Sequence, residues 1–168
     1  MFFMKTGRRT LRKSEPLELK IAGVLKKKKK TLAVAESCTG GLVSHSITNI
    51  PGSSVYFLGG VVAYSNRIKV SVLAVPPVTI KRHGAVSCQT VRAMAEGVKR
   101  LFKADIAAAV TGIAGPGGGT AVKPAGLVYM AFVSGRVKKT RKVIFRGDRI
   151  SVKKQFSRAV LKLILENI

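Results

Sequence analysis

The chain has 168 residues, of which 46% are hydrophobic, so it is long enough to bury a core and too apolar to be a disordered protein. It carries 31 Lys and Arg against 7 Asp and Glu, a formal net charge of +24, and most of this excess lies toward the two ends. A strong positive field attracts nucleic acid non-specifically, but no nucleic-acid-binding module pattern is present, so we favour a solvated basic surface.

Few residues are available for a disulfide framework or a metal centre. Cys38 and Cys88 lie in separate segments without CxxC spacing, and the chain has only two histidines. This pattern indicates reduced thiols and predicts neither a disulfide framework nor a metal site. The first residues lack the long apolar region of a secretion signal, and no apolar run approaches the roughly 20 residues of a membrane span. We therefore expect a cytoplasmic protein with no membrane partner.

Residues 1–15 are polar and basic, and we expect them to form a flexible arm ahead of a single domain over residues 16–168. Pro16 suits a first helical turn, and apolar residues recur at helical spacing from Leu17 to Leu25. The spacing predicts a helix that ends near Lys30, with the run Lys26–Lys30 as its solvated end.

The stretch Thr31–Gly41 is the one around which the rest of the chain is organised. Its apolar run Leu32–Ala35 predicts a buried parallel strand, which is followed by a polar turn and a helix over about residues 40–49. A strand, a sharp turn and a helix in this order can present a nucleophile, and the helix N-terminus favours an anion. Ser37 is the candidate nucleophile at this turn. The residues that would let the backbone approach a ligand are Thr39, Gly40 and Gly41.

The middle of the chain predicts alternating strands and helices. A strand is expected over Val61–Tyr64, then a short helix, a loop at Pro76–Pro77, and a helix capped by Ser87. The apolar stripe expected on that last helix consists of Val91, Met94, Ala95, Val98, Leu101 and Phe102. A strand over Asp105–Thr111 follows, apolar on both faces as in a sheet covered by helices.

The C-terminal part predicts a hairpin and a final helix. Gly126–Val133 and Val137–Phe145 flank a turn at residues 134–136, and Ser151 is the expected cap of the last helix. The whole order of elements predicts an α/β fold, a three-layer α/β/α sandwich with a mixed, mostly parallel central sheet.

A glycine-rich loop over Thr111–Thr120 is the second stretch whose residues suit ligand binding or catalysis. It lacks the Gly-Lys-Ser/Thr end of a Walker loop, and it leads into a strand, whereas a dinucleotide fingerprint opens a helix. What remains is a loop at the C-terminal end of a strand, where open α/β sheets bind ligands. Its candidate ligand-binding residues are Thr111, Gly112, Ala114 and Gly115.

Several motifs together resemble the CinA C-terminal domain family, the nicotinamide-nucleotide amidases. The stretches that carry the resemblance are Ala35–Gly41, Pro51–Ser54, Gly60–Asn66 with Lys69, His83–Ser87, Thr111–Pro116 and Lys123–Pro124. The resemblance runs from about Lys20 to Leu165. It implies a homodimeric α/β/α sandwich that hydrolyses nicotinamide mononucleotide to nicotinic acid mononucleotide and ammonia, a step of NAD salvage, without a metal or cofactor.

The resemblance also implies roles for individual residues. Ser37 is the nucleophile, and Tyr64 and Lys69 are its activating partners. Serine–lysine pairs replace the Ser-His-Asp triad in some hydrolases, and neither histidine is well placed to act as the base. Two features depart from the family: the high positive charge, and Ala121-Val122 where the family often has Pro and Glu.

Several alternatives stay open from the sequence. Cys38 is a rival nucleophile, Glu36 is expected to bond the turn rather than act as an acid, and Ser37 could merely cap a helix. Either loop could bind the substrate phosphate while the other stabilises the oxyanion. The protein could also be an amidase with another pyridine or nucleoside substrate, or a non-catalytic nucleotide- or nucleic-acid-binding member of the fold.

Overall fold

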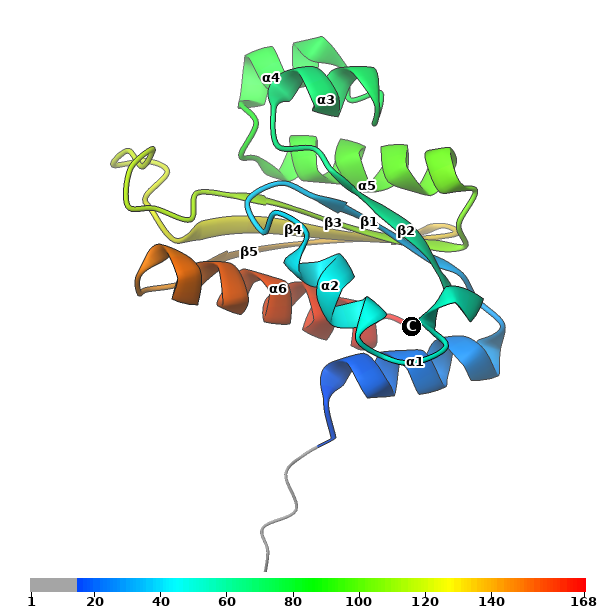
Figure 1. Cartoon of the computed structure of the whole chain (residues 1–168). Coiled ribbons are helices and arrows are strands. Elements are labelled where there is room, and N and C mark those ends of the chain that lie inside the picture. Colours follow the sequence, from blue (N-terminus) through cyan, green and yellow to red (C-terminus); the bar gives the residue numbers. More distant parts are fainter. Residues whose placement is uncertain (1–14) are drawn as a thin grey trace, which may run out of the picture.

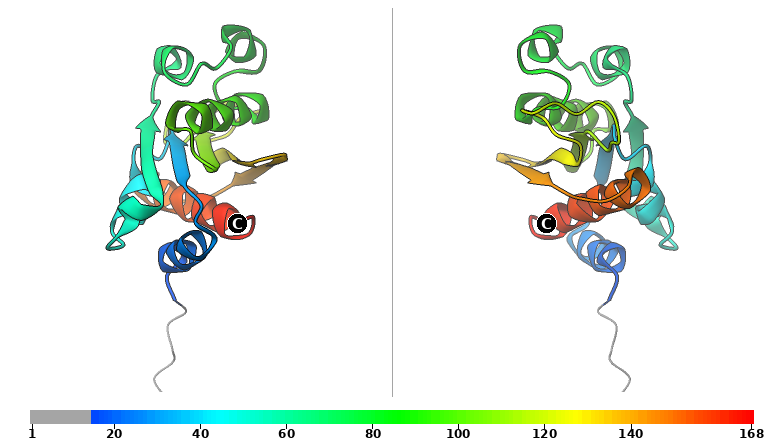
Figure 2. Two further views of the ribbon diagram at one scale, coloured as in Figure 1. Left: turned by 90° about the vertical axis from the view of Figure 1, so that its right-hand side faces the viewer. Right: turned by 90° about the vertical axis from the view of Figure 1, so that its left-hand side faces the viewer.

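The computed structural model describes residues 15–168, so the predicted basic arm lies outside the described residues except for Glu15. The chain forms one five-stranded sheet with helices on both faces (Figures 1 and 2). The elements are α1 (Leu17–Lys28), β1 (Leu32–Glu36), α2 (Leu42–Thr48), the short 3₁₀ helix η1 (Ser53–Val55), β2 (Phe57–Val62), α3 (Asn66–Ser71), α4 (Pro77–His83), α5 (Cys88–Phe102), β3 (Ile106–Gly112), β4 (Leu127–Ser134), β5 (Val137–Ile144) and α6 (Arg149–Leu165). None of these helices is both long and apolar enough to cross a membrane.

The strand order is β2-β1-β3-β4-β5, and β4 alone runs against the other four strands. The expected mixed, mostly parallel sheet is therefore confirmed. Because β1 pairs in parallel with both β2 and β3, the C-terminal ends of these three strands meet at the same edge of the sheet. This edge brings together Ser37, which follows β1, and the glycine loop that follows β3.

Two apolar layers hold the helices on the sheet. Side chains of α1, α2 and α6 pack with alternate residues of the strands on one face, among them Val34 and Val110. Side chains of α5 pack on the other face with the intervening residues, such as Ala33 and Ala109. All five residues of β1 are buried, as expected for a central strand with helices on both faces. The predicted three-layer sandwich is confirmed (Figure 2).

The second strand differs from its prediction. β2 begins at Phe57, and it ends before Tyr64, whereas the strand was expected over Val61–Tyr64. The Gly59-Gly60 pair, typical of a turn, lies within the strand, and α2 packs tightly against Gly60. A Cβ atom added at Gly60 would lie 2.4 Å from the Ser44 Oγ atom. Close packing, not a turn, therefore requires glycine at this position.

Three details of the helices also differ. A helix, α4, begins at Pro77 where a loop was expected, since proline suits the first helical position. The cap of α6 is Asp148 rather than Ser151: its Oδ1 accepts hydrogen bonds from the N–H groups of Ile150 and Ser151. Leu101 is half exposed and does not belong to the buried stripe of α5.

Candidate functional site

Ser37 lies at the tight turn between β1 and α2. Its N–H donates a hydrogen bond to the Val110 carbonyl on β3, at 3.1 Å, which fixes the turn against the sheet. Gly40 and Gly41 follow with φ angles of 64° and 100°, values that favour glycine, so the turn depends on these residues. The Ser37 side chain is 8% exposed, and its hydroxyl faces a cavity at the C-terminal edge of the sheet.

Glu36 fastens the turn to the first residues of α2. Its buried carboxylate accepts hydrogen bonds from the N–H groups of Gly41, Val43 and Ser44 and from the Ser44 hydroxyl, at 2.7–3.1 Å. A side chain therefore occupies the N-terminus of α2, where an anion was expected to bind. The expectation that Glu36 bonds the turn is confirmed.

The structure does not bring the predicted ligand-binding residues Thr39, Gly40 and Gly41 into the cavity. Thr39 is fully buried, Gly40 is exposed beside Lys153, and the Gly41 N–H is bonded to Glu36. None of the three lines the cavity. Two loops were considered for binding the substrate phosphate and the oxyanion. Residues 111–115 line the cavity, so this geometry favours their loop as the one that contacts the substrate.

Replacing Glu36 by Gln is expected to lower the free energy of unfolding by about 3 kcal/mol. The amide keeps one acceptor oxygen but turns an NH₂ group toward backbone donors, which leaves buried N–H groups without partners. Chemical denaturation measures the change. The control is Glu96→Gln, because Glu96 forms part-exposed ion pairs with Arg92 and Lys138 that are worth about 1 kcal/mol or less. Equal losses in the two variants would contradict the anchoring role of Glu36.

Lys69 lies on α3, and its side chain contacts Ser37. The side chain is 2% exposed, and its Nζ atom donates hydrogen bonds to the Ser37 Oγ atom, at 3.1 Å, and to the Ala63 carbonyl, at 2.7 Å. Burial lowers the pKa of Lys69 below its usual value, because it disfavours the ammonium form. A buried amine beside a serine hydroxyl can accept the hydroxyl proton once it is neutral.

The local structure explains how Lys69 reaches this position. The Ser65 hydroxyl caps α3 by accepting a hydrogen bond from the Ile68 N–H, and the Ala63 N–H bonds the Glu36 carbonyl at the end of β1. These bonds tie the start of α3 to the turn that carries Ser37. The short link between β2 and α3 thereby directs the lysine side chain back toward β1.

Cys38, the rival nucleophile, is buried next to Ser37. Burial raises the pKa of its thiol to about 12, so the thiol stays protonated near neutral pH. Only the thiolate is a strong nucleophile. The geometry therefore favours Ser37 over Cys38.

The cavity has a volume of about 280 Å³ and is open to solvent. Its walls come from the turn after β1, the link from β2 to α3, the residues before α5, the glycine loop and the start of α6. The predicted site residues that line it are Ser37, Tyr64, Lys69, Thr111, Gly112, Ala114 and Gly115. The Thr111 hydroxyl bonds the Ala85 carbonyl, at 2.9 Å, and so holds the segment before α5 against the glycine loop.

Arg149, the first residue of α6, also lines this cavity and was not predicted from the sequence. Its Nη1 atom donates to the Gly115 carbonyl, at 2.7 Å, and its Nη2 atom donates to the Tyr64 hydroxyl, at 3.0 Å. Tyr64 is 62% exposed, and the hydrogen bond of its hydroxyl is to Arg149 rather than to Lys69. The guanidinium thus joins the glycine loop to the tyrosine at the cavity mouth.

Both histidines lie outside this arrangement. His45 and His83 are exposed, on α2 and at the end of α4, and neither lines the cavity. Within residues 15–168, no three His, Cys, Asp or Glu side chains are grouped so that they could hold a metal ion. Among the described residues, the hydrogen-bonded Ser37–Lys69 pair is the candidate nucleophile and base.

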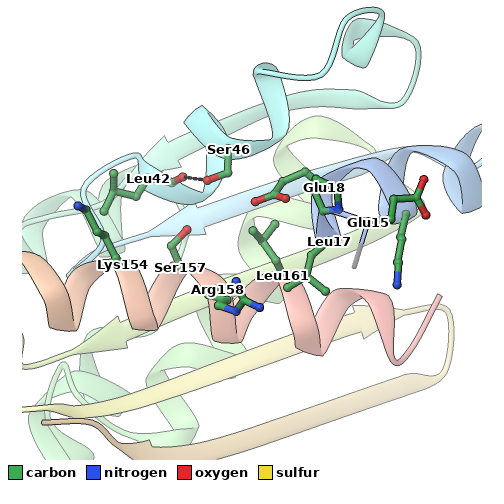
Figure 3. Close-up of a pocket in the computed structure, with 11 residues that line it drawn as sticks. Glu15, Leu17, Glu18, Leu42, Ser46, Lys154, Ser157, Arg158 and Leu161 are labelled. Carbon is green, nitrogen blue, oxygen red and sulfur yellow. Dashed lines mark hydrogen bonds between the residues drawn. The ribbon is translucent and has the colours of Figure 1, made fainter. Parts of the chain in front are cut away.

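A larger cavity, of about 500 Å³, lies between α1, α2 and α6 (Figure 3). It is lined by Glu15, Glu18, Lys154 and Arg158 together with serine and leucine side chains. The Ser157 Oγ atom there is buried without a hydrogen-bond partner, and the Ser46 hydroxyl is bonded to the Leu42 carbonyl. Its lining from residues 15–168 includes no hydrogen-bonded pair of a nucleophile and a base, so the smaller cavity is the candidate active site.

Comparison with known proteins agrees with the motifs at this site. A family model described as the CinA C-terminal domain matches residues 14–168. The chain belongs to the CinA C-terminal domain family. It is 50% identical over 151 residues to a "CinA-like protein" of Syntrophus aciditrophicus and 45% identical over 154 residues to one of Thermotoga neapolitana. These matches cover 89% and 92% of this chain but only 36% and 38% of the relatives, so the chain spans less than two fifths of their length.

Solved structures of CinA-family proteins share the fold. The competence damage-inducible protein A of Klebsiella pneumoniae is 35% identical, with a TM-score of 0.87, over 90% of this chain and 94% of that one. A competence/damage inducible protein of Agrobacterium tumefaciens is 36% identical, also with a TM-score of 0.87, over 89% of this chain and 92% of that one. The sandwich described above is therefore the fold of this family.

Proposed function

We propose that this CinA C-terminal domain is a serine amidase that converts nicotinamide mononucleotide to nicotinic acid mononucleotide and ammonia. The observation that carries the proposal is the 3.1 Å hydrogen bond between the Lys69 Nζ atom and the Ser37 Oγ atom at the wall of an open cavity. Burial favours the neutral amine, which is the form of a lysine that can act as a base.

The reaction follows from this pair in two halves. The Ser37 Oγ atom attacks the carboxamide carbon and gives its proton to the Lys69 Nζ atom. The tetrahedral intermediate collapses, the C–N bond breaks, and the lysine proton goes to the leaving nitrogen, which departs as ammonia. Water then attacks the acyl-enzyme and gives its proton to Lys69. The bond from carbon to Oγ breaks, the carboxylic acid product leaves, and Ser37 recovers a proton.

The other cavity residues suit a phosphorylated substrate. The loop Thr111–Gly115 lines the same cavity as Ser37 and Lys69, and we assign it the backbone donors for the developing oxyanion. Arg149 supplies a cation at the mouth, and a guanidinium is well suited to bind a phosphate. We place the carboxamide toward Ser37 and the phosphate toward Arg149. The bond from Arg149 to the Tyr64 hydroxyl makes Tyr64 a positioning residue for that cation.

The test is a substrate panel for the purified protein. Ammonia release is measured with nicotinamide mononucleotide, nicotinamide riboside and nicotinamide, and the acid product is identified by mass. We expect the nucleotide to give the highest kcat/KM, because only it offers a phosphate to Arg149. A preference for the riboside would redirect the proposal to another pyridine substrate, consistent with the exposed Ala121 and Val122 in the loop. Release from none of the three would reject it.

Replacing Arg149 by Lys is expected to lower kcat/KM for the nucleotide about 10-fold, mainly through KM, with little change in stability. Lysine keeps the positive charge, but it lacks the planar fork that reaches both the Gly115 carbonyl and the Tyr64 hydroxyl. Steady-state kinetics and a thermal melt measure the two effects. Arg146→Lys is the control, since Arg146 is exposed and does not line the cavity that holds Ser37. Equal effects from the two variants would contradict this role.

A non-catalytic, nucleic-acid-binding role is the second candidate. It is favoured by the edge strand β5, whose exposed residues include Lys138, Lys139, Arg141 and Lys142. Tight DNA binding that weakens steeply with salt, without ammonia release, would support it. Millimolar affinity with a shallow salt dependence would exclude it.

A further inference from the structure

The cavity of about 500 Å³ between α1, α2 and α6 is separate from the candidate active site, and the two share no lining residue (Figure 3). Its volume lies within the range of small-molecule sites, about 300–1,000 Å³. Its side chains recur every three or four residues along one face of a helix, as helical geometry requires. Those used below are Leu42 and Ser46 on α2 and Lys154, Ser157, Arg158 and Leu161 on α6. The cavity can therefore hold a ligand of its own.

Ser157 places a buried hydroxyl without a partner at this cavity. The residue is 5% exposed, and its Oγ atom has no hydrogen-bond partner among residues 15–168. The Oγ atom points from α6 toward α2, into the space that the lining residues surround (Figure 3). Buried polar groups are nearly always hydrogen-bonded, because an unpaired one is unfavourable. A polar group of a bound ligand would supply the missing partner.

Two carboxylates at the same cavity are also unpaired within the described part of the chain. The protein has 7 Asp and Glu. Five of them are bonded inside the fold, namely Glu36, Glu96, Asp105, Asp148 and Glu166. The other two, Glu15 and Glu18, both line the cavity, and neither forms an ion pair with another side chain of residues 15–168. Two carboxylates side by side in a strongly basic chain are suited to bind a cationic group.

Basic and apolar side chains complete the lining. Lys154 and Arg158 lie on the α6 side of the cavity, and Figure 3 shows Ser157 between the side chains of Lys154 and Glu18. Leu42 and Leu161 add apolar surface between the charged groups. The cavity therefore offers a negative end, a positive end and an apolar middle with one hydroxyl.

We infer that this cavity binds a short free peptide. The terminal amine of the peptide pairs with Glu15 and Glu18, and its terminal carboxylate pairs with Lys154 and Arg158. Ser157, between the two ends, bonds the peptide group. A net cation would be repelled by a chain of charge +24, and a simple anion would face two carboxylates. A zwitterion has no net charge and offers each wall an opposite partner.

The test is isothermal titration calorimetry of the purified protein with four probes: leucyl-leucine, N-acetyl-leucyl-leucine, leucyl-leucine amide and leucine. We expect leucyl-leucine to bind most tightly, because it fills the apolar middle and carries both terminal charges. Each capped dipeptide lacks one charge and should bind about 10-fold more weakly, the scale of losing a charge-assisted hydrogen bond. Leucine has both charges but is too short to reach both walls, so it should also bind more weakly.

Two variants locate the binding in this cavity. Glu18→Gln should weaken leucyl-leucine about 10-fold and leave N-acetyl-leucyl-leucine unchanged, since the acetylated peptide has no amine to pair with Glu18. The matched control is Glu166→Gln, because Glu166 pairs with Arg141 and does not line the cavity. Ser157→Ala should weaken leucyl-leucine about 5-fold while the melting temperature stays the same or rises, because the change removes an unpaired buried hydroxyl. A purely structural hydroxyl would instead lower the melting temperature.

Each of several results would overturn the inference. These are no heat of binding with leucyl-leucine up to about 10 mM, equal affinity for the capped and free dipeptides, tighter binding of leucine, and equal effects of Glu18→Gln and Glu166→Gln. Earlier melting of Ser157→Ala with unchanged affinity would do the same. The cavity shares no residue with the one that holds Ser37, so these measurements stand or fall independently of amidase activity.

Discussion

Replacing Ser37 by Ala is expected to reduce kcat for ammonia release from nicotinamide mononucleotide by about 10⁴-fold or more, the cost of removing a catalytic nucleophile. The Ser37 Oγ atom is the hydroxyl within hydrogen-bond distance of the buried Lys69 amine, so the alanine variant has no atom to form the acyl-enzyme. The variant should still fold, because the Glu36 carboxylate and the Ser37 backbone bond to Val110 hold the turn. Ammonia assays under saturating substrate, together with a thermal melt, measure both effects.

The matched control for Ser37→Ala is Cys38→Ala at the next position. Burial keeps the Cys38 thiol protonated, so its loss should change kcat only a few-fold, through packing. If Cys38→Ala were inactive and Ser37→Ala active, the nucleophile would be Cys38 and not Ser37. Wild-type protein should also accumulate an acyl-enzyme on Ser37, detectable by mass spectrometry after rapid acid quenching. Labelling at any other residue would contradict the mechanism.

The sequence predicted the central strands well because both contain an uninterrupted apolar run. The runs Leu32–Ala35 and Ile106–Val110 have no polar face, which is typical of strands covered by helices on both sides. The predicted bounds, Leu32–Ala35 and Asp105–Thr111, lie within one residue of those of β1 and β3. Parallel pairing of these strands brings their C-terminal ends together. The proximity of Ser37 and the glycine loop could therefore be predicted from the fold class.

The position of Lys69 could not be derived from local sequence alone. A lone lysine in a short helix is usually exposed, and only the resemblance to the CinA family indicated its role. No sequence pattern indicated a role for Arg149. It lies in a basic segment, and its hydrogen-bond partner Tyr64 is 85 positions away in the sequence. Contacts at such separation depend on how α6 packs against the sheet. The predicted bounds of β2 were wrong for a similar reason. The packing of α2 on Gly60 is a tertiary contact, which local sequence does not reveal.

Replacing Lys69 by Met is expected to reduce kcat about 10³-fold, the scale of removing a general base. In the wild type, kcat/KM should rise with pH as Lys69 loses its proton, and because burial lowers the pKa of Lys69, this rise should occur below the usual range of a lysine. The methionine variant keeps a similar length and apolar stem, so it should bind substrate with little change in KM. Its residual rate should lack this pH-dependent rise. Retained activity with the wild-type pH profile would exclude Lys69 as the base.

The same substitution should change how stability depends on pH. The unfolded chain holds the Lys69 proton up to its ordinary pKa of about 10.5, whereas the folded protein releases it at lower pH. Between these two values the unfolded state binds more protons, so the contribution of Lys69 to the free energy of unfolding increases as pH rises. Lys69→Met removes this contribution, and the exposed-residue control Lys81→Met does not. Denaturation curves at several pH values from neutral to about 10, taken as the difference between wild type and variant, therefore report the state of Lys69 without any assay of catalysis. A difference that stays constant across this range would mean that Lys69 keeps its proton in the folded protein and cannot serve as the base for Ser37.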